Sequence, residues 1–349
     1  MRHICLLAVL ITATSLATSL AACADKTDAD YRADVVLSIH DSIAGDLDDL
    51  VTAARNLQAA SPSRAWNETT DMLAITNMRE AWKRTRIAYE HIEGAVVSLF
   101  PGVDAALDAR YDESLAKLGA AGDQDLFDAR GVTGMHGIER ILFAPDIRPE
   151  VIAFESALPG YKPAAYPATD DEAIEFKTVL VQLLIDKASA LRKQWNPAVI
   201  DIGTAYRGLV GLMHEAKEKV NLATTGEEES RYANITLFDL RNNLEGTQKV
   251  YGLFRDWIRS KSAGVQYDLA LQEKFADLAD LYSHVTSDSL PAAPLDWTPD
   301  APTPDNLATE FGTLWQRVHE SVDPNSDRSV VFQMNHIANL LGLPQFVEP

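Results

Sequence analysis

Apolar residues recur at steps of three and four along most of this chain, and that spacing limits the fold to helices. The first such pattern, between 28 and 59, runs through Val36, Ile39, Ile43, Leu47 and Leu50. Residues at these steps share one face of an amphipathic helix. Alternation with a period of two is nearly absent, and no Asn-Gly or Asp-Gly pair marks a hairpin. The sequence therefore predicts an all-α protein.

The same spacing predicts the remaining helices and their grouping. They are expected over 71–99, 170–195, 203–222, 234–262, 266–286, 305–322 and 328–341, with Pro101-Gly102 ending the 71–99 helix. Five prolines in 144–169 predict a mainly irregular connection, and five more in 290–304 predict a loop. We expect two helical bundles that divide near residue 196, one over 31–195 and the other over 196–349.

Residues 1–22 have the composition of a secretory signal peptide. Arg2 precedes an apolar stretch, and no acidic residue occurs before Asp25. Leu20-Ala21-Ala22-Cys23 resembles a bacterial lipobox, which predicts that Cys23 is acylated and that 23–30 form a membrane tether. Cleavage of an ordinary signal peptide is the alternative. The mature chain then holds no other cysteine, which excludes disulfides and thiolate metal sites.

A formal charge of −20 narrows the classes of partner. It argues against nucleic acid, because phosphate binding needs a basic patch. An acidic surface suits cations or basic partners, and it also simply keeps a protein dispersed. The charge by itself leaves these interpretations open.

Only one histidine, His136, has a carboxylate three residues ahead of it. In Gly134-Met135-His136-Gly137-Ile138-Glu139, His136 and Glu139 would share a helix face, one turn apart. Without thiolates, a metal site must use histidine and carboxylate, which favours iron, zinc, manganese or copper. A surface histidine beside a solvated glutamate is the alternative. The sequence contains neither HExxH nor ExxH, which rules out the zinc-protease helix and the paired ferritin-like di-iron signature.

Carboxylates also gather in an earlier segment. Glu90 and Glu93 lie one turn apart, with Arg86 one turn before Glu90. If residues 104–112 are helical, they carry a row of carboxylates at steps of four, made of Asp104, Asp108 and Asp112. A solvated charged face is the alternative interpretation of both patterns.

A third polar segment lies in the second half of the chain. Glu227 to Asn234 is followed by an apolar pattern that is interrupted by Asp239, Asn242, Asn243 and Glu245. Buried polar groups need partners. We therefore expect this face to meet a site or another bundle.

At these three segments the sequence resembles the imelysin family, over about residues 30–345. Gly134, His136 and Glu139 stand where the family has its Gly-x-His-x-x-Glu hallmark. Residues 85–93 and 107–110 look like the corresponding parts of the EfeO- and EfeM-like iron-uptake members. Residues 232–251 (YANITLFDLRNNLEGTQKVY) are similar to the family's C-terminal signature.

The resemblance implies a periplasmic, all-helical protein of two related bundles with a metal site. In EfeO-like members this site is associated with iron, which is taken up together with an iron permease and a haem peroxidase. Carried over residue by residue, it implies that His136 and Glu139 are ligands. Glu93 and Asp108 are the next oxygen ligands, followed by Glu90, while Arg86 orients or neutralises the glutamates. Iron is the metal expected, with zinc or copper as alternatives.

The chain also departs from the family pattern. No N-terminal cupredoxin domain precedes the matching region, so the chain resembles the shorter, EfeM-like form. Where EfeO-like members often read Tyr-Ser-His-Thr-Asp, this chain has Tyr232-Ala233-Asn234-Ile235-Thr236, and no second-site histidine is expected there. We favour a lipid-anchored iron-binding protein. The alternatives are a zinc-dependent metallopeptidase that uses His136 and Glu139, and cation-dependent binding of an acidic polysaccharide.

Overall fold

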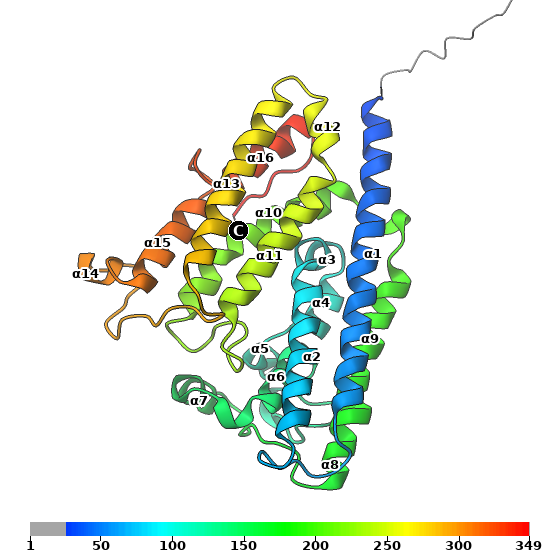
Figure 1. Ribbon diagram of the computed structural model, residues 1–349, viewed down its shortest axis with the longest axis vertical. Coiled ribbons are helices and arrows are strands. Elements are labelled where there is room, and N and C mark those ends of the chain that lie inside the picture. The colour runs from blue at the N-terminus through cyan, green and yellow to red at the C-terminus, as the bar shows by residue number, and fades with distance from the viewer. Residues whose placement is uncertain (1–25, 349) are drawn as a thin grey trace, which may run out of the picture.

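The computed structural model describes residues 26–348, and these fold into helices joined by loops and turns (Figure 1). Within this range there is no strand, so the predicted all-α class is confirmed. None of its helices combines the length and apolar character that crossing a bilayer requires. The predicted signal peptide, the lipidation site Cys23 and the start of the tether lie outside the described residues.

The first group of helices is built on α1 (Asp28–Ala60), which confirms the helix predicted at 28–59. Its apolar face, including Ile39, Ile43 and Leu47, is fully buried against two antiparallel neighbours. These are α2 (Met72–Glu90) and α9 (Val181–Gln194). A π-helical stretch, Phe176–Leu180, joins α9 to α8 (Asp170–Glu175), so the predicted helix at 170–195 is continuous.

The single helix predicted over 71–99 is wrong, because the structure divides it. Between α2 and α3 (Glu93–Leu99) the helix is interrupted at His91 and Ile92. A glycine of a distant helix, Gly246, packs so closely there that an added Cβ would lie 2.4 Å from the Cα of His91. The helix ends at Leu99, before Pro101-Gly102, as predicted. Pro101 then begins a further helix, α4 (Pro101–Leu107), because a first-turn proline gives up no intrahelical hydrogen bond.

Two further expectations about this half can be compared with the structure. The row through Asp104, Asp108 and Asp112 is not one helix, because α4 ends at Leu107 and α5 (Tyr111–Leu118) begins after a non-helical turn. The connection over 144–169 is mainly irregular, as predicted, and it also contains a helix, α7 (Pro149–Ser156), that starts at a proline for the same reason as α4. Between them, α6 (Gly134–Leu142) confirms that the His136 segment is helical.

The second group consists of α10 to α16, and its predicted helices are present with shifted ends. Their bounds are α10 (Ile202–Leu222), α11 (Thr236–Gly252), α12 (Arg255–Arg259), α13 (Gly264–His284), α14 (Pro304–Leu307), α15 (Glu310–Val322) and α16 (Val330–Leu341). The helix predicted at 234–262 is interrupted after Gly252, and the one at 305–322 is divided between α14 and α15. The proline-rich segment 290–303 is irregular, as predicted.

The two groups meet where α3 packs against α10. The backbones come so close that a Cβ at Gly208 would lie 1.9 Å from the carbonyl oxygen of Gly94. One hydrophobic cluster runs through both groups and includes Leu47, Trp82 and Leu244. The division into two domains near residue 196 stays a prediction.

Candidate metal centre

A buried cluster of charged side chains lies where the two groups of helices meet. The first group contributes Arg86 and Glu90 from α2, Glu93 from α3, Asp108 from the end of α4, and His136 and Glu139 from α6. The second contributes Lys219 from α10, Glu229 from the loop that follows, and Asp239 and Asn243 from α11. We call this set the junction cluster.

Two contacts fix the position of α6, one with the end of α4 and the other with α2. Gly134 has φ +85°, and a Cβ there would lie 2.6 Å from the carbonyl oxygen of Leu107, so the motif glycine permits the approach. The indole nitrogen of Trp82 donates to the carbonyl oxygen of Met135 at 2.9 Å, which ties α6 to α2. His136 consequently faces the residue after Leu107, Asp108.

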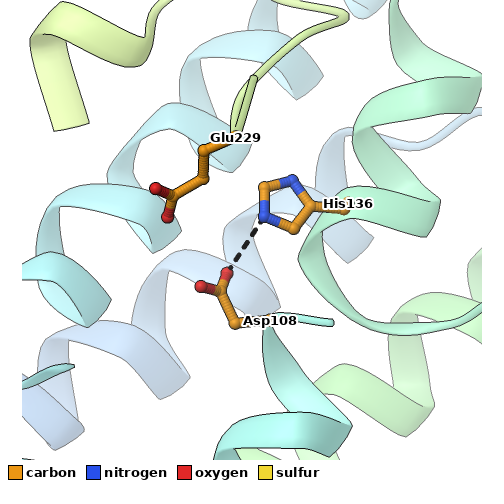
Figure 2. A group of neighbouring side chains, drawn as sticks. All are labelled: Asp108, His136 and Glu229. Carbon is orange, nitrogen blue, oxygen red and sulfur yellow. Dashed lines mark ion pairs between the residues drawn. The ribbon is translucent and has the colours of Figure 1, made fainter. Parts of the chain in front are cut away.

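The ring of His136 is held between two carboxylates. Its Nδ1 lies 2.8 Å from Glu139 Oε2, and its Nε2 lies 3.3 Å from Asp108 Oδ1 (Figure 2). The other oxygen of Glu139 accepts the backbone N–H groups of Tyr232 and Ala233, at 3.1 and 2.8 Å. Burial by itself would lower the pKa of His136, but Asp108 and Glu139 outweigh it and raise the pKa to about 9.

Two overlapping groups of side chains have the spacing of metal ligands. The first group consists of Asp108, His136 and Glu229. Each offers one possible ligand atom, and these three atoms lie within 4.8 Å of one another. Figure 2 shows the carboxylates of Asp108 and Glu229 on the same side of the imidazole. In the second group the members are Glu90, Glu93 and Glu229. Glu229 belongs to both, so it stands between two adjacent cation positions.

Negative charge exceeds positive charge in the junction cluster. Arg86, which is fully buried, pairs with Glu90 and Asp108, and its nitrogens lie 2.8 Å from Glu229 and 3.5 Å from Asp239. Within the described residues, two other side chains that can carry positive charge contact carboxylates of the cluster. They are His136 and Lys219. Burial raises the pKa of Asp239 to about 7 and that of Glu90 well above its usual range. Burial thus favours the neutral, protonated forms of these two carboxyl groups.

A cavity of about 300 Å³ leads from solvent to the junction cluster. Its wall includes Glu93, Asp108, Lys219 and Glu229, and nearer the surface Glu113 and Glu218. An acidic passage concentrates cations. The buried ligand groups are thus reachable by a small ion.

The structure brings together most of the residues that the sequence predicts for a site. His136, Asp108, Glu93, Glu90 and Arg86 all belong to the junction cluster. Glu139 belongs to it as well, but its oxygens face His136 Nδ1 and backbone N–H groups.

Other polar residues of the sequence prediction divide between the cluster and the surface. Asp239 and Asn243 lie in the cluster, as expected for a polar face that meets a site. Asp112 instead pairs with Arg231 at 2.8 Å, and the side chain of Glu245 is 73% exposed.

The sequence interpretation missed Glu229 and Lys219. Glu229 lies within the acidic run 227–229, which was noted but given no ligand role, and the run contains nothing that distinguishes Glu229 from Glu228. Lys219 belongs to no motif. The assignment of ligands remains a prediction.

Comparison with known proteins shows the family of this chain. The family model described as imelysin matches residues 43–297. This chain belongs to the imelysin family. A crystal structure of an imelysin-like protein from Psychrobacter arcticum 273-4 superposes on this imelysin with a TM-score of 0.56 over 91% of this chain and 98% of that chain. Their sequences are 11% identical, so the likeness shows the shared fold.

Curated relatives of this imelysin are named as parts of iron uptake systems. The iron uptake system component EfeM of Pseudomonas syringae pv. syringae (strain B728a) is 25% identical over 54% of this chain and 52% of its own length. The component EfeO of Escherichia coli (strain K12) is 24% identical over 58% of this chain and 43% of its own length. The chain thus spans about half the length of the curated relatives it matches.

Proposed function

We propose that this imelysin binds iron at Asp108, His136 and Glu229, as a component of an iron uptake system. The observation that carries the proposal is the position of His136 Nε2. This nitrogen is buried, contacts Asp108 Oδ1 at 3.3 Å without forming a well-aligned hydrogen bond, and faces carboxylates that come from both groups of helices. A buried ring nitrogen that lacks a well-aligned hydrogen bond and faces two carboxylates is suited to bind a metal ion.

The donor set suits iron. Carboxylate oxygens are hard donors, which iron in its ferric form prefers, and one imidazole is a common ligand of both oxidation states. Glu90 and Glu93 stand ready as further oxygen donors, and Arg86 offsets part of their charge. In this proposal Glu139 keeps the proton on Nδ1 of His136 and leaves Nε2 free to bind the metal.

The wider role rests on the relatives. Since EfeM and EfeO are named iron uptake system components, we place this imelysin in the periplasm, lipid-anchored through Cys23. We propose that it passes iron onward with an iron permease and a haem peroxidase as partners. Zinc and copper are the competing metals for the same donors.

Equilibrium dialysis of metal-stripped mature protein tests the site. Iron is supplied as Fe²⁺ under anoxic conditions or as Fe³⁺ citrate, with Zn²⁺ and Cu²⁺ as competitors. We expect one tightly bound iron per chain, and we expect His136→Ala, Asp108→Asn and Glu229→Gln each to weaken binding severely. His284→Ala is the matched control, because the side chain of His284 is 72% exposed.

The outcomes separate the proposal from its alternatives. Unchanged iron affinity in His136→Ala would refute the site. Hydrolysis of a denatured protein substrate that is lost with chelator and restored by Zn²⁺ would favour a metallopeptidase instead.

A further inference from the structure

Lys219 points its ammonium group into the second of the two cation positions. Nζ lies 2.6 Å from Glu229, 3.5 Å from Glu93, and 3.1 Å from the side-chain oxygen of Asn243. Only about a tenth of the lysine side chain is exposed. The ammonium is thus fixed by three oxygens at a buried site, rather than solvated as lysines usually are.

The second position is shaped to receive a cation. Its three carboxylates, Glu90, Glu93 and Glu229, are almost completely buried. The amide nitrogen of Asn243 donates to Glu93 at 2.7 Å and also to Glu90, which holds both carboxylates in place. Like charges this close favour a positive group among them. Lys219 provides that group beside Arg86.

The negative charge around this position is not fully offset. Asp239, which is wholly buried, lies 3.5 Å from Arg86, and neither of its oxygens has a hydrogen-bond partner in the described part of the chain. A buried carboxyl group whose oxygens lack hydrogen bonds favours positive charge nearby. The position therefore needs its ammonium, or a cation in the ammonium's place.

We propose that Lys219 is a tethered cation that occupies a second metal position and so limits this protein to one bound ion. The inference rests on the proposed iron site, because both positions share Glu229. An ion at Asp108, His136 and Glu229 then has an ammonium rather than a second metal as its neighbour.

The test is to count the iron ions that Lys219→Met binds. Iron is supplied in the oxidation state that the wild-type protein retains. Methionine keeps the length and apolar stem of lysine but removes the ammonium. We expect one ion per chain in the wild type and two in Lys219→Met, and we expect the second to be lost again in Lys219→Met/Glu93→Gln.

Lys217→Met is the matched control. Lys217 lies two residues away on α10, where it pairs with Glu348 at the surface. The substitution removes the same charge from the same helix, and we expect the variant to bind one ion. Circular dichroism checks that each variant is folded. If Lys219→Met does not fold, Lys219→Gln replaces it, because glutamine is neutral and can still donate to Asn243.

The possible outcomes are distinguishable. One ion in both the wild type and the folded Lys219 variant would overturn the inference and leave the iron site intact. Two ions in the wild type would also overturn it, because the lysine would then exclude nothing. A wild-type protein that binds no iron would refute the proposed function itself, and the inference with it.

Discussion

The two ring nitrogens of His136 have different partners and therefore different tasks. Nδ1 contacts Glu139, whose other oxygen is held by the backbone N–H groups of Tyr232 and Ala233. Nε2 faces Asp108. A carboxylate behind a histidine fixes the tautomer and orientation of a metal ligand. We therefore assign Glu139 a positioning role, although its spacing from His136 would equally suit a direct ligand.

We predict that Glu139→Gln weakens iron binding by about 10- to 100-fold, the usual loss when the partner of a ligating histidine is removed. The amide oxygen can still accept the backbone N–H groups. Its NH₂ group then faces Nδ1 of His136, which must accept, and the ring proton moves to Nε2. Equilibrium dialysis measures the loss, and urea unfolding shows whether the fold is kept.

Glu113→Gln is the control for that measurement. Glu113 lines the same cavity and pairs with Arg110, but it does not contact His136. We expect this variant to bind iron as the wild type does. Equal losses in the two variants would mean that charge in the cavity, and not the orientation of His136, determines affinity.

At the scale of helices and turns, apolar spacing predicts where helices form but not where they stop. The interruption at His91 and the turn at Asp108 depend on glycines far away in the sequence, Gly246 and Gly134. Local periodicity contains no information about such contacts. The same limit explains the site: residues within a helical motif, such as His136, could be predicted, whereas Glu229 comes from a loop without periodicity.

We predict that Gly134→Ala destabilises the protein by about 1–3 kcal/mol, the cost of a strained backbone conformation outside glycine. Its φ is +85°, and the new Cβ would press on the carbonyl oxygen of Leu107, so α6 must also shift away from Asp108. Urea unfolding measures the free energy, and we expect a parallel loss of iron affinity.

Gly45→Ala provides the comparison within a helix. Gly45 lies inside α1 with nothing within 4 Å of an added Cβ, and we expect a gain of about 0.5–1 kcal/mol. If Gly134→Ala matched the wild type in both stability and iron affinity, the proposed placement of α6 would be wrong.

On the scale of the whole molecule, the acidic composition serves two purposes. Most of the 51 carboxylates lie at the surface, where they keep the protein dispersed. A few are buried where the two groups of helices meet, paired with Arg86 and Lys219. The candidate site is therefore built from the same residues that join the two groups of helices. An ion that binds only the folded protein is expected to stabilise it.

The stability of the whole molecule should also fall in mild acid, in part because of His319. Burial, and to a lesser extent the charge of Lys217, lower the pKa of His319 to about 4, from an ordinary value of 6.5. The unfolded chain therefore takes up a proton at higher pH than the folded protein. The contribution of His319 is present above pH 6.5 and is lost as the pH falls from 6.5 toward 4.

We predict that His319→Gln loses less stability than the wild type between pH 7 and pH 4.5. Glutamine does not titrate, and its amide can replace the contact of His319 with Asn221. Urea unfolding across this range gives the difference. If the stability of the two proteins depended on pH in the same way, the lowered pKa of His319 would be contradicted.

Anomalous diffraction at the iron edge, from crystals of the iron-loaded wild-type protein, tests the central claim most directly. The account predicts one strong peak bounded by Nε2 of His136 and the carboxylates of Asp108 and Glu229, with Glu139 still in contact with Nδ1. Iron bound only at exposed carboxylates, with Asp108 and His136 in their metal-free arrangement, would contradict it.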